Sequence, residues 1–249
     1  MLWRFPYHFG RYLMMLWQAF SAPENYRMYW KETVRQMYDI GIGSLIIVAL
    51  ISIFIGAVSG LQFVYQLDGQ LIPMYYIGYI VRDLAIIELS PTFTNLVLSG
   101  KVGSNMTSEI GGMRQKEHID AMEIMGLNTA AYLVLPRTIA SLAVIPLLVA
   151  VSAILAIAGG YAATVLPGEL SHTDYVRGLR TFYNPYNIQM MFVKSYVFAF
   201  ILSTVSCYQG YFVKSGSVNL GKATTQAVVY SNILILLADY LLVVLLTSD

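Results

Sequence analysis

Long apolar stretches, separated by short polar segments, make up most of this chain. Three of them contain no Asp, Glu, Lys or Arg: residues 40–67, 138–168 and 195–213. Two more carry a single charge each, Lys101 in residues 89–108 and Asp239 in residues 223–248. A helix needs about 20 apolar residues to cross a hydrocarbon layer about 30 Å thick, and each stretch reaches that length. The pattern therefore predicts an all-α, polytopic membrane protein with five transmembrane helices.

The first 40 residues carry a different pattern. Their uncharged run, residues 12–23, is too short to cross a bilayer and is rich in Tyr, Trp and Met. Aromatic and cationic residues are interleaved along the region: Trp3, Arg4, Arg11, Trp17, Arg27, Trp30, Lys31 and Arg35. Such residues favour helices in the headgroup layer, whereas a disordered basic tail is poor in aromatics. We expect N-terminal interfacial helices in residues 1–40 and a five-helix transmembrane domain in residues 41–249.

Composition narrows the class of protein further. Apolar residues make up 57% of the 249-residue chain and charged residues only 12%, against about 25% charged in soluble domains. The formal net charge of +1 gives no overall field that would attract nucleic acid. Cys207 is the only cysteine, which excludes a disulfide within the chain and a multi-cysteine metal site.

Small residues recur every four positions in three of the predicted spans. They are Ser52, Gly56 and Gly60, then Gly100, Ser104 and Ser108, and finally Ser152, Ala156 and Gly160. This spacing places small side chains on one face of a helix and lets two backbones approach closely in lipid. It predicts a compact bundle and offers a face for self-association.

The segment KEHIDAMEIMG, residues 116–126, departs from its apolar surroundings. On a helical wheel its charged side is formed by Lys116, Glu117, Asp120 and Glu123, with Ile124 intruding, and its apolar side by Ile119, Ala121, Met122 and Met125. Gly126 is expected to end the helix. A helix this short needs a surface to lie on, and the pattern is typical either of a solvated connector or of a helix that docks into a partner's groove. Because the acids are expected to face water, it does not indicate acid–base or metal chemistry.

The distribution of Lys and Arg predicts the orientation. With a cytoplasmic N-terminus, eleven of the fifteen positive charges fall on the cytoplasmic side and four on the other. Cytoplasmic loops of membrane proteins carry the excess of Lys and Arg. The count predicts a cytoplasmic N-terminus and a C-terminus on the outer side, with residues 116–126 in the cytoplasm.

A longer stretch around this segment resembles a known family. Residues 88–140, ELSPTFTNLVLSGKVGSNMTSEIGGMRQKEHIDAMEIMGLNTAAYLVLPRTIA, resemble the signature region of the MlaE family of ABC-transporter permeases, the lipid permeases that include the chloroplast TGD-type proteins. The likeness continues in FIGAVSGLQ from Phe54, in VKSYVFAF around Lys194 and in GKATTQAVV from Gly221. It covers nearly the whole chain, so the sequence is identified as similar to this family throughout.

The resemblance implies a coupling helix at about residues 114–126. This helix would sit in a cleft of a separate cytoplasmic ATPase and pass its motion to the membrane bundle. The residues expected to take part in this coupling are Arg114, Glu117, Ile119, Asp120, Met122, Glu123 and Met125. ATP and Mg²⁺ would then be bound by the partner and no cofactor by this chain. The segment GSVNLGK, residues 216–222, matches most of a P-loop, but Ala223 replaces the hydroxyl residue that binds Mg²⁺.

The resemblance also implies a phospholipid cavity at the centre of a homodimer. The residues expected to line it are Leu61, Gln62, Val64, Tyr65, Glu88, Leu89 and Lys194. Many family members have R-E-L-G-P where this chain has Ile87 to Pro91, IELSP, so the arginine is absent and Lys194 is the expected phosphate contact. From the residues themselves, Ser90 and Pro91 suit the N-cap and first position of the second span, and Lys101 and Glu109 suit one helix face.

The function implied is that of a permease subunit in the bacterial inner membrane. It would move phospholipids between that membrane and the outer envelope, driven by ATPase subunits. A periplasmic MCE-domain protein and a STAS-domain protein are the further partners implied. Two other classes stay open from the residues alone: an ATP-independent channel or secondary carrier for a small solute, and a scaffold that only anchors a partner. His8, His118 and His172 form no catalytic motif, so we expect no enzyme activity in this chain.

Overall fold

The computed structural model describes residues 4–20, 26–67 and 72–247, and every regular element within them is a helix. Trp3 lies outside these residues. The elements, with π-helical segments written η, are α1 (Arg4–Phe20), α2 (Tyr26–Leu67), α3 (Tyr76–Leu84), η1 (Ala85–Phe93), α4 (Thr94–Leu98), η2 (Ser99–Gly103), α5 (Ser104–Gln115), α6 (His118–Ile124), α7 (Thr129–Val165), α8 (His172–Arg180), α9 (Pro185–Tyr211) and α10 (Ser217–Thr247). The predicted all-α class is confirmed.

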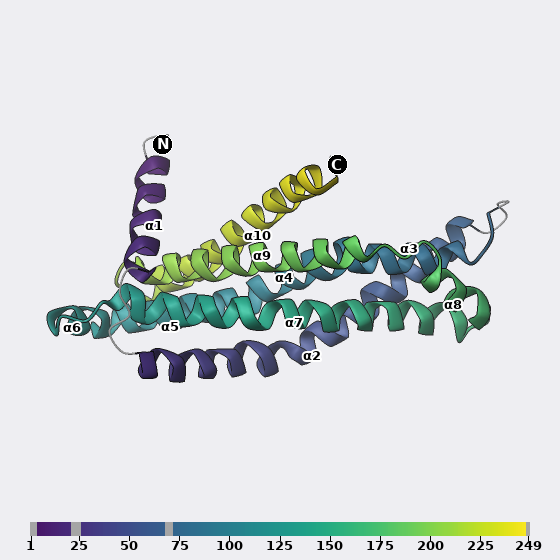
Figure 1. Ribbon diagram of the computed structural model, residues 1–249. Coiled ribbons are helices and arrows are strands. Elements are labelled where there is room, and N and C mark those ends of the chain that lie inside the picture. Colours follow the sequence, from purple (N-terminus) through teal and green to yellow (C-terminus); the bar gives the residue numbers. More distant parts are fainter. Residues whose placement is uncertain (1–3, 21–25, 68–71, 248–249) are drawn as a thin grey trace.

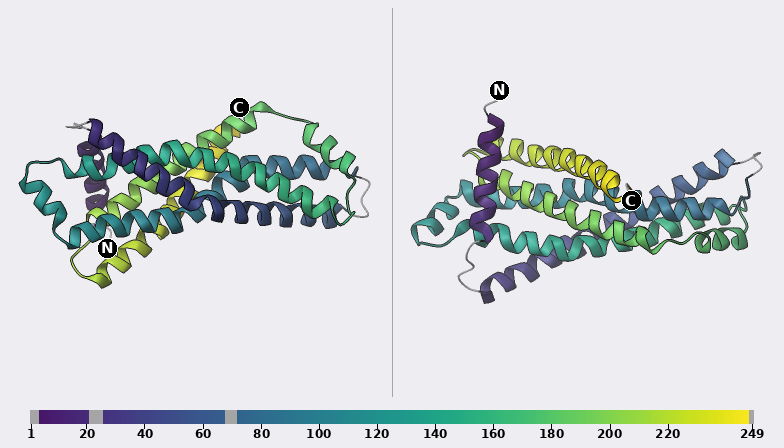
Figure 2. Two further views of the ribbon diagram at one scale, coloured as in Figure 1. Left: turned by 90° about the horizontal axis from the view of Figure 1, so that it is seen from below. Right: turned by 45° about the horizontal axis from the view of Figure 1, so that its top comes forward.

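The long helices form an elongated bundle. α2 packs along α7, α9 lies against α7 and α10, and the run from α3 to α5 also contacts α9. The short helix α6 lies at one end of the bundle and α8, with α3, at the other (Figures 1 and 2). The helix α1 is steeply inclined to the bundle and contacts α7 and α9 near the α6 end.

Four helices in the described part of the chain are long and apolar enough to cross a membrane: α2, α7, α9 and α10. They match four of the five predicted spans. The remaining one, residues 89–108, falls in a helical run from α3 to α5 that η1 and η2 divide into shorter pieces. Pro91 lies inside η1 and has no N–H to donate, which accounts for one departure from regular α-helical hydrogen bonding.

Helix boundaries differ from expectation at two other places. Ser90 and Pro91 do not begin a span, because the chain is already helical from Tyr76 and both residues are buried inside η1; the predicted cap is wrong. α2 runs without a break across residue 40, so residues 26–40 form the start of this long helix. α1 remains a separate amphipathic helix, with Met15 and Ala19 buried and Trp17 exposed.

The small-residue motifs of the first and third predicted spans pack against each other, which is the close approach that such residues allow. The Ser52 hydroxyl of α2 lies 2.7 Å from the Ser152 hydroxyl of α7. A Cβ added to Gly56 would lie only 1.8 Å from the carbonyl oxygen of Ala156, so a larger residue at 56 would force the two backbones apart. In the second predicted span, a Cβ on Gly100 would have no described heavy atom within 4 Å. That motif is therefore left open by the chain's own packing.

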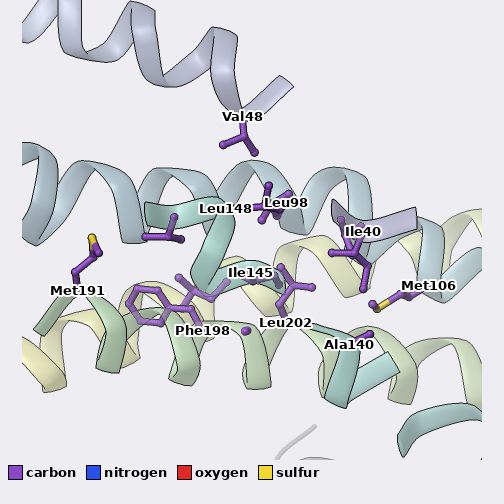
Figure 3. Packing of buried hydrophobic residues seen from close by; sticks show 14 of the residues in the cluster. Ile40, Val48, Leu98, Met106, Ala140, Ile145, Leu148, Met191, Phe198 and Leu202 are labelled. Carbon is purple, nitrogen blue, oxygen red and sulfur yellow. The ribbon is translucent and has the colours of Figure 1, made fainter. Parts of the chain in front are cut away.

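The central core joins the long helices between the two ends of the bundle. Phe198 and Leu202 of α9 pack with Ile145 and Leu148 of α7 and with Leu98 of α4 (Figure 3). A second cluster lies near α6 and α1, and a third near α8. The bundle therefore has three apolar clusters along its length, and a few charged side chains are buried among them.

Candidate transport site and coupling helix

Lys194 is the centre of a charged group buried in the bundle. Its side chain is 0% exposed, and its ammonium lies 2.8 Å from Glu88 Oε2 and 2.7 Å from Asp239 Oδ1. It also donates to the main-chain oxygen of Ile87 at 3.1 Å. The contacts with Glu88 and Ile87 are hydrogen bonds, whereas the contact with Asp239 is an ion pair without hydrogen-bond geometry. We call Glu88, Lys194 and Asp239 the charge triad.

The triad joins three elements that are far apart in the sequence. Glu88 lies in η1, Lys194 in α9 and Asp239 in α10. Thr92, one turn after Glu88, places its hydroxyl 3.2 Å from Asp239 Oδ2 and 3.4 Å from Glu88 Oε1. π-helical segments are rare and often occur at functional sites, which fits the position of Glu88 inside one.

The exposure of the three side chains is graded. Lys194 is fully enclosed, Asp239 is 10% exposed and Glu88 is 37% exposed. Two carboxylates face one ammonium, so with all three groups charged the triad carries one excess negative charge. Ions inside a membrane bundle are costly unless paired, and Lys194 provides that pairing. Glu88 is thus the most exposed member of the triad, whereas Lys194, the expected phosphate contact, is enclosed in the single chain.

The structure brings together only some of the residues predicted to line a lipid cavity. Glu88 and Lys194 are in contact, but Val64 is buried in the apolar cluster near α8 with Ile77 and Tyr175. Gln62 and Tyr65 are exposed on α2, and Leu61 is half-buried. Leu89 lines a crevice of about 10 Å³ between α2, η1 and α7, about the space of one water molecule. The lipid-binding roles of these residues stay predictions.

A second ion pair was not found from the sequence. Arg137 of α7 is 2% exposed and its guanidinium lies 2.9 Å from Glu109 of α5. Lys101, which was expected on the same helix face as Glu109, donates to the carbonyl oxygen of Gly43. Arg137 and Glu109 each lie close to the end of an apolar stretch, where a charge also suits the interface, so the sequence held no signal for their pairing.

Arg82 fastens the α8 end of the bundle. Its side chain is 5% exposed and pairs with Asp83 at 2.7 Å. It also donates to the main-chain oxygens of Leu179, Thr181 and Phe182, at 2.7, 2.9 and 3.2 Å. The sequence indicated no role for Arg82, which does not stand at position 87, where many family members have arginine. The structure shows that it connects α3 to the turn between α8 and α9.

The predicted coupling helix is present but shorter than expected. α6 begins at His118, because Glu117 has a left-handed backbone with φ 60° that separates it from α5. It ends at Ile124, and Gly126, two residues later, has a φ of +80°. The Leu127 N–H bonds to the oxygen of Met122 and the Gly126 N–H to the oxygen of Glu123, at 3.1 and 3.0 Å. These bonds form a Schellman motif, which confirms Gly126 as the stop.

The faces of α6 differ from those of the helical wheel. Ile119 is fully buried and Met122 is half-buried, whereas Ile124 is 87% and Met125 67% exposed. The acids do reach solvent, since the side chains of Asp120 and Glu123 are each 48% exposed, but both also contact the bundle. Asp120 lies 3.0 Å from Arg114 of α5, and Glu123 accepts a hydrogen bond from Tyr211 of α9. The left-handed backbone at Glu117 changes the direction of the chain before α6 begins. A helical wheel drawn through residues 116–126 assumes one continuous helix and cannot show this change.

The structure has several apolar spans, charges paired inside the bundle and an exposed short helix at one end. These features define a multi-pass membrane protein of the permease class. Comparison with known proteins agrees: the model of a family described as permease MlaE matches residues 33–245. The chain belongs to the MlaE permease family.

Relatives of the chain come from bacteria and a plant. A probable ABC transporter permease protein of Rickettsia felis is 34% identical over 96% of this chain and 92% of its own length. The chloroplastic protein TRIGALACTOSYLDIACYLGLYCEROL 1 of Arabidopsis thaliana is 30% identical over 87% of this chain and 61% of its own length. The intermembrane phospholipid transport system permease protein MlaE of Haemophilus influenzae is 28% identical over 94% and 89%.

Proposed function

We propose that this chain is the permease subunit of an ABC transporter that moves phospholipids between the bacterial inner membrane and the outer envelope. Family membership, with relatives whose names include an ABC transporter permease and a phospholipid transport permease, supports this function. The observation that carries the mechanism is α6, a short helix with exposed Ile124 and Met125 at one end of the bundle. Such a helix suits a groove in a partner protein.

The energy source is a separate protein. Two cytoplasmic ATPase subunits would bind ATP and Mg²⁺, and each would receive one α6. The N-terminus and α6 then lie on the cytoplasmic side and the C-terminus on the periplasmic side, as the Lys and Arg count favours. A periplasmic MCE-domain protein would receive or deliver lipid on the outer face, and a STAS-domain protein would bind the ATPase.

Lipid would be held between two copies of the chain. The crevice at Leu89 is far too small for a phospholipid, so a single chain does not offer the cavity there. Exposed apolar residues follow α10, among them Ile233, Tyr240 and Leu245, and the small residues at Gly100 and Ser104 leave a second open surface. A homodimer that faces these surfaces inward would enclose a larger apolar space, with Glu88 at its edge.

The docking of α6 is tested with the ATPase co-expressed and the permease tagged. Ile124→Asp places a charge on the exposed apolar tip, so we expect loss of the ATPase from the purified complex. Leu166→Asp is the matched control, because Leu166 is a similarly exposed apolar residue, 78%, at the opposite end of the bundle. Asp120→Lys, which faces Arg114 with a second cation, should also release the ATPase. Retention by Ile124→Asp and Asp120→Lys would contradict the proposed docking.

A further inference from the structure

The carboxylate of Glu123 ties the short helix α6 to two long helices. Glu123 Oε1 accepts a hydrogen bond from the Tyr211 hydroxyl at 3.1 Å, and the Thr129 hydroxyl donates to the same oxygen at 3.3 Å. The two hydroxyls are themselves 2.7 Å apart. Thr129 is the first residue of α7 and Tyr211 the last residue of α9. One carboxylate oxygen therefore joins three helix ends.

Arg114 adds a fourth helix to this contact. It lies in the last turn of α5, with its guanidinium 3.0 Å from Asp120 and 3.7 Å from Glu123. The same guanidinium lies over the Tyr211 ring, 6.0 Å from its centroid. We call Arg114, Glu123, Thr129 and Tyr211 the latch.

The position of α6 depends on few other contacts. α6 has seven residues, too few to form a stable helix alone, and Ile119 is its buried apolar anchor. Its main chain packs on α5 and α7, and the Tyr211 hydroxyl supplies a direct contact with α9. Ile119 also belongs to the apolar cluster that includes Cys207 and Tyr208 of α9, so Glu123 is the polar link, beside an apolar one, through which a displacement of α6 reaches α9.

The helix α9 connects the latch to the charge triad. Tyr211 and Lys194 lie on the same uninterrupted helix, about 25 Å apart along its axis at 1.5 Å per residue. Lys194 holds Glu88 and Asp239 through its ammonium. A rigid helix with one polar contact at its α6 end and another deep in the bundle suits the transfer of a movement between them.

We propose that the latch transmits displacement of α6 into α9, with Tyr211 and Thr129 as positioning residues that couple the ATPase to the charge triad. The proposal rests on the proposed function, because a docked ATPase is what displaces α6. It changes the role expected for Glu123: its carboxylate connects the coupling helix to the bundle instead of contacting the ATPase. Arg114 and Glu123 are half-exposed, so their contacts add little to stability, whereas Thr129 and Tyr211 are buried, so folding of their variants is checked first.

The test uses the permease–ATPase complex in proteoliposomes, with ATP hydrolysis and phospholipid movement measured together. Tyr211→Phe removes only the hydroxyl. We expect the ATPase to stay bound and ATP to be hydrolysed, while phospholipid moved per ATP falls about 2- to 30-fold, the range for residues along a coupling network. Tyr208→Phe is the matched control, one turn earlier in α9, where the hydroxyl contacts His8 at 2.8 Å instead of α6. It should leave the ratio unchanged.

Two further variants decide whether the contact itself is responsible. Glu123→Ala should lower the ratio as Tyr211→Phe does, and the double variant should be no worse than Glu123→Ala alone, because both remove one contact. An unchanged ratio in Tyr211→Phe and Glu123→Ala, or an equal loss in Tyr208→Phe, would overturn the latch. If Tyr211→Phe does not fold, Thr129→Val and Glu123→Ala test the same contact between α6 and the bundle. Absence of the ATPase from the wild-type complex would instead contradict the proposed function.

Discussion

The ammonium of Lys194 and the carboxylate of Asp239 lie 2.7 Å apart inside the bundle, with the lysine side chain fully enclosed. Because Lys194 also pairs with Glu88, its removal leaves two carboxylates facing each other without a cation. We expect Lys194→Met to lower the free energy of unfolding by about 3–5 kcal/mol, the cost of breaking a buried ion pair. Thermal unfolding of the purified protein in detergent measures this loss.

The matched comparison is Arg137→Met. Arg137 is as buried as Lys194 but pairs with one carboxylate, Glu109, which is 37% exposed and can be hydrated, whereas Lys194 also pairs with Asp239, which is 10% exposed. The expected loss is therefore smaller, about 1–3 kcal/mol. A larger loss for Arg137→Met than for Lys194→Met would contradict the assignment of the triad as the more critical charged group.

The close approach of α2 and α7 predicts a strong effect of a single methyl group. Gly56→Ala places a Cβ 1.8 Å from the Ala156 oxygen, so the helices must move apart, at a cost of about 1–3 kcal/mol. Gly43→Ala is the control on the same helix, because a Cβ there meets no described heavy atom within 4 Å. We expect Gly43→Ala to be neutral or stabilising, by up to about 1 kcal/mol, since alanine favours helices. Equal melting temperatures for the two variants would refute the packing argument.

The two isoleucines of α6 should behave in opposite ways. Ile119 is fully buried, so Ile119→Ala should cost about 2–5 kcal/mol of stability. Ile124 is 87% exposed, so Ile124→Ala should leave the melting temperature unchanged while weakening retention of the ATPase. A destabilised Ile124→Ala variant would show that this side chain packs within the permease and is not presented to a partner.

Much of the fold could be predicted from the sequence, because membrane spans depend on length and hydropathy alone. The first, third, fourth and fifth predicted spans became long helices. Pro91 and the π-helical segments around it were not anticipated, since hydropathy does not distinguish α from π hydrogen bonding. Gly126 was read correctly because a helix-ending glycine is a local signal.

The partners of the charged residues depended on the tertiary fold. Glu88, Lys194 and Asp239 could each be chosen as a costly intramembrane charge, yet only the packing of η1, α9 and α10 shows that they meet. Helical spacing placed Glu109 on one face with Lys101 but could not show that Arg137 from α7 is its partner. Glu123 lies toward Tyr211 because the backbone turns at Glu117. Glutamate rarely adopts a left-handed backbone, so its residue type gave no sign of this turn.

We propose that this permease works as a homodimer with two ATPase subunits and carries phospholipid. Native mass spectrometry of the complex, extracted gently from its own membrane by a tag on this chain, tests it most directly. We expect a mass of two permease copies and two ATPase subunits, with bound phospholipid released on activation. A chain that appears alone in several detergents, without ATPase and without lipid, would contradict the claim.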